Sequence, residues 1–190
     1  MKPIDNLKEE HVLIGRMLTV LEGYVRDAQA GRSLSPAALR EAIHFVRGYA
    51  DQCHHGKEEK VLFPALSEKS EGIAQGPVRV LESEHEIGRT LVGQVEAAIP
   101  GIEAGEAQAT QQAARALDEY TRMLRQHITK EEDVLFELAP MLLSQQEEET
   151  LAEEFEAVER QMGEDAHHRF EDLVAALERQ AGVAPSPGGA

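Results

Sequence analysis

The sequence contains one cysteine, Cys53, among its 190 residues. A single cysteine cannot form an intramolecular disulfide, and chains without disulfides are typical of reducing compartments. No apolar signal core follows Met1, and no uncharged apolar run approaches the roughly 18–20 residues that a membrane-spanning helix needs. We therefore expect a soluble cytoplasmic protein with no membrane partner, in which Cys53 is a small core residue.

Basic residues are also scarce. Lysine and arginine together number 19 against 35 acidic residues, which gives a formal net charge of −16. A surface with this charge repels phosphate backbones and anionic lipids, so we expect no nucleic-acid partner and no membrane-surface partner. The sequence also has no nucleophile constellation and no phosphate-binding glycine loop, so it does not indicate the enzyme classes that depend on them.

Helix-forming residues dominate, and glycine and proline fall mainly between long amphipathic stretches. This pattern predicts an all-α protein, an up-down-up-down four-helix bundle with an extra C-terminal fifth helix. The bundle helices are expected at about residues 4–30, 36–66, 77–100 and 106–137. Pro64 is expected to break or bend the second helix, and Pro140 to end the fourth. Ser144 and Glu147 resemble a capping box that opens the fifth helix.

These elements divide the chain into a bundle at residues 1–140, an additional helix within residues 141–181 and a tail at residues 182–190 that we expect to be disordered. The length suits one well-buried domain better than two. The additional helix has two interpretations, which the sequence leaves open. It covers one face of the bundle, or it joins two copies of the chain into a homodimer.

One phrase occurs twice in the chain. HHGKEEKVLFP begins at His54, and its near-copy HITKEEDVLF begins at His127, 73 residues later. Positions i and i+4 share one helix face, so His54 and Glu58 can reach one centre, as can His127 and Glu131. A single His-x-x-x-Glu pair is weak evidence, because most such pairs are solvated. Repetition of the whole phrase favours a metal site.

A further histidine precedes each copy, with His11 lying 43 residues before His54 and His85 lying 42 residues before His127. The order therefore predicts two related helical hairpins. Four imidazoles and two carboxylates suit two metal ions better than one, and this mixture favours iron, manganese or zinc over magnesium or calcium. We predict two iron ions, with manganese or zinc as alternatives and with Glu58 and Glu131 as bridging ligands. The predicted metal ligands are His11, His54, Glu58, His85, His127 and Glu131.

The two phrases, together with Gly76-Pro77 and the later Glu84-His85-Glu86, resemble the hemerythrin-like (HHE cation-binding) family. The resemblance covers about residues 5–140. It implies a four-helix bundle around a non-haem di-iron centre, held by the six positions named above.

The chain departs from the oxygen-carrying hemerythrins at two positions. Those proteins have a His-x-x-x-His pair on the third helix, whereas Arg89 stands four residues after His85 here. They also tend to end with His-x-x-x-x-Asp, whereas this chain has His127 and Glu131 separated by three residues. Four histidines and two glutamates resemble instead the branch that includes bacterial iron-cluster repair proteins.

A missing ligand leaves more open coordination, so we expect the centre to react with or sense oxygen, peroxide or nitric oxide. This would place the protein in defence against oxidative or nitrosative stress or in repair of iron centres. One alternative is a carrier or store of oxygen or iron without turnover, and another is a signalling or structural bundle that metal stabilises. The sequence does not decide whether the protein is an enzyme.

Other polar residues have less specific interpretations. Arg89 is a surface cation, or it contacts Glu58 or Glu131 or an anionic adduct. A ferritin-like site would use Glu41 with His44 and Glu82 with His85, but neither pair is repeated. The remaining candidates are read as solvent-facing, supporting or core residues: His55, Glu59, Tyr120, Glu132, His167 and His168.

Overall fold

The structure, a computed structural model, describes residues 1–70, 72–163 and 165–183. Within these ranges every regular element is a helix, which confirms the all-α prediction. In chain order the elements are α1 (Pro3–Gln29), α2 (Pro36–Phe45), η1 (Val46–His55), η2 (Glu58–Leu62), α3 (Phe63–Lys69), α4 (Gln75–Glu103), α5 (Ala107–Lys130), η3 (Glu131–Leu135), α6 (Phe136–Leu142), α7 (Gln145–Met162) and α8 (Ala166–Ala181). The η segments are π-helical, with backbone hydrogen bonds to the carbonyl five residues earlier.

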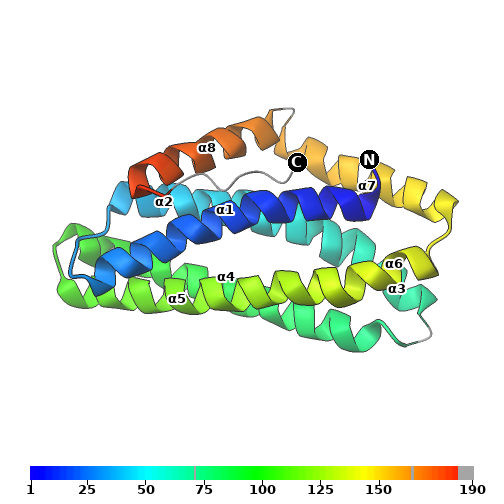
Figure 1. Cartoon of the computed structure of the whole chain (residues 1–190), viewed down its shortest axis with the longest axis horizontal. Coiled ribbons are helices and arrows are strands. Elements are labelled where there is room, and N and C mark those ends of the chain that lie inside the picture. The colour runs from blue at the N-terminus through cyan, green and yellow to red at the C-terminus, as the bar shows by residue number, and fades with distance from the viewer. Residues whose placement is uncertain (71, 164, 184–190) are drawn as a thin grey trace.

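Four long helical rods form the bundle (Figure 1). The first is α1, the second runs from α2 through η1 and η2 into α3, the third is α4, and the fourth runs from α5 through η3 into α6. Helix α5 packs against both α1 and α4. Among the described residues, no helix is long and apolar enough to cross a bilayer.

Both copies of the repeated phrase contain a π-helical turn at the same place. The Phe63 N–H donates to the carbonyl of Glu58, and the Phe136 N–H donates to the carbonyl of Glu131. Pro64 follows the first turn, but Glu137 stands at the matching position of the second, so proline is not required for the turn. Such turns are frequent at functional sites.

Three predicted helix ends differ from the structure. Pro64 does not end the second rod, which continues to Lys69, and α4 continues through Pro100 to Glu103. The fourth rod likewise runs past Pro140 to Leu142. Proline removes one backbone hydrogen bond from each rod, and packing against neighbouring helices outweighs that local loss.

The C-terminal segment forms two helices where the sequence pattern predicts one. The capping box at Ser144 and Glu147 is present, since each side chain bonds the backbone N–H of the other residue. The break between α7 and α8 comes at Gly163, whose φ of 95° lies in a region that side-chain-bearing residues rarely adopt. Of the predicted disordered tail, residues 184–190 lie outside the described residues.

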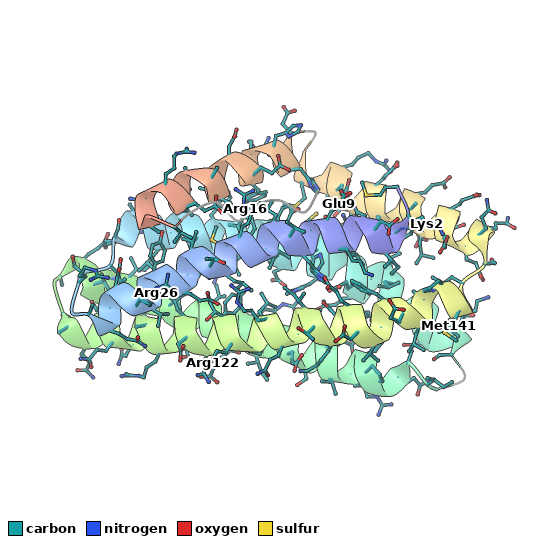
Figure 2. All side chains as sticks on the ribbon, viewed as in Figure 1. Lys2, Glu9, Arg16, Arg26, Arg122 and Met141 are labelled. Carbon is teal, nitrogen blue, oxygen red and sulfur yellow. The ribbon has the colours of Figure 1, made fainter. Side chains whose placement is uncertain are left out.

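Helices α7 and α8 lie along one side of the bundle, next to α1 and the second rod (Figure 1). Phe170 of α8 is buried against Gly48, where an added Cβ would lie 2.6 Å from its ring. Arg16 of α1, labelled in Figure 2, donates two hydrogen bonds of 2.9 and 2.7 Å to the buried Glu178. The additional segment therefore covers one face of the bundle, and a homodimer through it stays a prediction.

Candidate metal centre

The six predicted ligands lie together in one buried polar layer. Figure 2 shows charged side chains such as Glu9 and Arg122 projecting outward from the rods, whereas none of the six exposes more than 4% of its surface. On each rod the layer falls between two apolar clusters, for example between Leu7 and Ile14 on α1. The six residues are His11 on α1, His54 in η1, Glu58 in η2, His85 on α4, His127 on α5 and Glu131 in η3.

The histidines form two pairs, one from each hairpin. The Nε2 atoms of His11 and His54 lie 3.0 Å apart, and those of His85 and His127 lie 3.1 Å apart. Burial lowers the pKa of His54 to about 4, which keeps this ring neutral at pH 7. Each hairpin therefore brings two imidazole nitrogens to one point.

Every Nδ1 atom of these four rings faces a carboxylate. The partners, at 2.7–3.0 Å, are Glu132 for His11, Glu10 for His54, Glu59 for His85 and Glu84 for His127. An ionised carboxylate only accepts, so each Nδ1 carries a proton, and a ring that is otherwise neutral turns the lone pair of its Nε2 inward. Two facing lone pairs repel one another, and a cation between them converts this repulsion into two ligand bonds.

The two glutamates span both histidine pairs. Glu58 places its oxygens 3.5 Å from Nε2 of His54 and 3.6 Å from Nε2 of His85. Glu131 places its oxygens 3.3 Å from Nε2 of His11 and 3.1 Å from Nε2 of His127. Each carboxylate thus offers one oxygen to each hairpin.

These four carboxylate oxygens are buried and have no hydrogen-bond partner among the described residues. The short distances to Nε2 atoms do not satisfy them, because those nitrogens carry lone pairs. Burial and the neighbouring charge of Glu131 raise the pKa of Glu58 well above its usual range. An unpaired buried carboxylate costs several kcal/mol. The donor set therefore fits cations that would neutralise both glutamates.

The chain matches the hemerythrin HHE cation-binding domain over residues 2–139, most of its length. It belongs to this family. Similar proteins include uncharacterized proteins Rv1995 and MT2051 of Mycobacterium tuberculosis and Mb2018 of Mycobacterium bovis. Each is 29% identical over 180 residues, which cover 94% of this chain and 70% of the relative. No solved structure matches the chain significantly.

A lysine supports one carboxylate in each half of this hemerythrin-family centre. Lys57 Nζ donates to Glu10 at 2.6 Å, and Lys130 Nζ donates to Glu84. Glu10 and Glu84 each precede the first histidine of their hairpin and bond the second one, so the repeat includes them. The His-x-x-x-Glu spacing does not indicate this role, although the Glu-His dipeptide that occurs in both hairpins is a signal for it.

Glu59 and Glu132 have solvent-facing and supporting roles as their two predicted interpretations, and the structure shows the supporting one. Both are partly exposed, and they accept hydrogen bonds from His85 and His11. Each follows a glutamate of the centre in sequence and supports a histidine of the other hairpin. Sequence spacing alone does not predict such a crossed pairing. It requires the two hairpins to pack face to face.

Arg89 contacts neither Glu58 nor Glu131, so that alternative is wrong. It donates to Asp51 at 2.9 Å and to Glu59 at 2.7 Å. Because Glu59 accepts from a histidine of the centre, Arg89 fixes that carboxylate from outside.

His55, predicted to be a supporting or exposed residue, is buried, with 6% of its surface exposed. Its ring stacks on His85 with centroids 3.8 Å apart and planes at 13°. One of its nitrogens lies within 4.8 Å of ligand atoms of Glu58, His85 and His127. The repeat does not indicate a position for His55 beside the centre, because the second copy of the phrase has Ile128 in its place.

The remaining candidates behave as ordinary residues. Glu41 and Glu82 are exposed, which excludes the ferritin-like arrangement. Tyr120 is buried in the core, as predicted, and its ring also lines a cavity beside His85, which was its other interpretation. Cys53 is buried as well. Burial raises the pKa of the Cys53 thiol to about 12, so it is not a reactive thiolate at pH 7.

Proposed function

We propose that the protein holds two iron ions in this centre and uses them to react with or sense oxygen, peroxide or nitric oxide. The observation that carries the proposal is that Glu58 and Glu131 each reach both histidine pairs. Each ion would then receive two imidazoles and one oxygen from each glutamate. Histidine and carboxylate sets of this kind leave positions open for exogenous ligands on non-haem iron.

The chain's own groups would prepare the centre for such an ion pair. The four outer carboxylates fix the ring orientations and increase the basicity of each Nε2 atom. Glu58 and Glu131 together offset half of the charge of two divalent ions. The apolar clusters on both sides limit access of water. Bound iron would supply redox chemistry and open coordination positions, whereas zinc, which fits the same ligands, would supply no redox chemistry.

The test is anaerobic loading with ferrous iron, followed by metal counting and optical titration with oxygen, peroxide and nitric oxide. We expect two irons per chain and rapid spectral change with at least one oxidant. Fewer than two irons would refute the dinuclear proposal. A stable and reversible oxygen adduct would indicate the carrier function instead, with no turnover.

Two variants test the bridging role. Glu58→Gln and Glu131→Gln should each reduce the iron content below two per chain, because an amide is a weaker ligand and leaves charge uncompensated. Glu41→Gln, an exposed change on the same rod as Glu58, is the matched control and should keep two irons. Full iron retention in both bridging variants would contradict the assignment.

A further inference from the structure

A cavity of about 240 Å³ lies against one side of the centre. Its walls come from η1, α4 and α5, and they include His85 and His55 but neither His11 nor His54. By the same measure one water needs only about 10–15 Å³, so small molecules of several atoms fit inside. The cavity therefore reaches His85, whose partner in the pair is His127, and it reaches neither ring of the other pair.

The cavity exists where a glycine replaces a bulky residue of the other hairpin. Gly88 stands three residues after His85, and Ile14 stands three residues after His11. Ile14 is 3% exposed and packs in the apolar core. The atoms nearest to a Cβ at Gly88 would belong to Met123 and to the ring of Tyr120, both at 3.4 Å.

The side without this cavity is covered by α7. Lys57 is fully buried there, and its ammonium group donates hydrogen bonds to Glu159 of α7, to Asn6 and to Glu10. Lys130, the equivalent residue on the cavity side, has 43% of its side chain exposed. The two halves of the centre therefore differ in their access to solvent.

His55 lies between the cavity and the centre. It lines the cavity, and one of its ring nitrogens lies near ligand atoms of His85 and His127. Its Nδ1 faces Asp51 at 3.4 Å, and Asp51 is bonded by Arg89, so the ring is anchored. Rings that share an ion point their nitrogens at a common centre. The ring of His55 instead lies parallel to the ring of His85, so we place His55 next to this predicted ligand and not among the ligands.

The charges on the cavity wall already have partners. Arg89 is bonded by Asp51 and Glu59, and Arg47 is bonded by Glu96 at 2.6 Å. Among the described residues of this wall, no cation without a partner is therefore offered to an anionic ligand, and the net charge of −16 repels anions further. The cavity suits small uncharged molecules.

We infer that an exogenous ligand enters through this cavity and binds the ion held by His85 and His127, in contact with His55. The ligand is a small uncharged molecule of the class that includes nitric oxide, oxygen and hydrogen peroxide. The ion held by His11 and His54 stays closed to it. This inference rests on the proposed di-iron function.

The first test uses nitric oxide with the anaerobic ferrous protein. Mössbauer spectra should show that nitric oxide shifts one of two iron signals. Gly88→Ile, which copies Ile14, should slow nitric oxide binding at least tenfold with two irons retained, and Gly88→Ala should slow it about threefold. Gly93→Ile is the matched control, because a Cβ at Gly93 of the same helix meets nothing within 4 Å. Unchanged rates in both Gly88 variants, or nitric oxide on both ions, would overturn the inference.

The second test concerns His55. His55→Ala should keep two irons and change nitric oxide dissociation at least fivefold, with a shift in the N–O stretching frequency, whereas Ile128→Ala should change neither. An unchanged frequency and rate would refute the contact. Loss of one iron per chain would also overturn it, because His55 would then be a ligand. If the unmodified protein binds fewer than two irons, the proposed function itself fails. This outcome differs from the results that would overturn entry through the cavity or the contact with His55.

Discussion

Lys57 and Lys130 provide a paired test of how the two halves of the centre differ. They occupy equivalent positions in the two copies of the phrase, and each bonds the carboxylate that supports a histidine. Lys57 is fully buried, with Glu10 also buried at 2% exposure, whereas Lys130 is 43% exposed at its side chain. The same substitution, to methionine, should therefore have unequal effects.

The expected magnitudes follow from burial. Lys57→Met leaves Glu10 and Glu159 without their cation, and breaking a buried pair costs about 3–5 kcal/mol. Lys130→Met removes a pair in which the lysine is 43% exposed and Glu84 15% exposed, and ion pairs that water reaches contribute about 0–1 kcal/mol. For a chain of this length, 1 kcal/mol corresponds to about 2–4 °C in Tm. We expect Tm to fall by about 6–20 °C for Lys57→Met and by less than about 4 °C for Lys130→Met.

The assay is differential scanning calorimetry of both variants and the unmodified protein, in excess ferrous iron under nitrogen. Lys57→Arg, which keeps the charge, is the control and should recover part of the loss. Equal Tm shifts for the two methionine variants would refute the reasoning. They would mean that burial of Lys57 under α7 does not increase the contribution of its ion pairs to stability.

Three further predictions concern metal, ligand support and the docking of α8. Removing iron with a chelator should lower Tm, because Glu58 and Glu131 then lose their neutralising cations, and an unchanged Tm would contradict this reasoning. Glu84→Gln should weaken iron affinity about 10–100-fold in a competitive chelator titration, while the exposed Glu82→Gln should not. Phe170→Ala should lower the free energy of unfolding in urea by about 3–5 kcal/mol, since its buried ring packs against the second rod, and a change below 1 kcal/mol would argue against that docking.

The features that sequence predicts well are local ones. The spacing of His54 and Glu58 fixes their shared helix face, and the repetition at His127 and Glu131 identifies the second half. The capping box at Ser144 is equally local, because its partners lie three residues apart. In each case helical geometry alone brings the groups together.

The features that sequence does not predict depend on packing between helices. Glu132 supports His11 from the opposite hairpin, and a spacing of 121 residues carries no periodic signal for that contact. Pro100 lies inside a helix because tertiary contacts outweigh its local preference. His55 is buried because its ring stacks on His85 of α4, although its neighbour His54 points the other way and pairs with His11 of α1.

The two hairpins share their ligands and the carboxylates that support them, yet three differences fall on opposite sides of the centre. Ile14 fills the space on one side that Gly88 leaves open on the other. Ile128 stands where the cavity side has His55, and α7 covers Lys57 while Lys130 reaches solvent. None of these differences alters a predicted metal ligand. Two ions held alike by a symmetric set of ligands would therefore differ in their access to small molecules, because the surrounding residues differ.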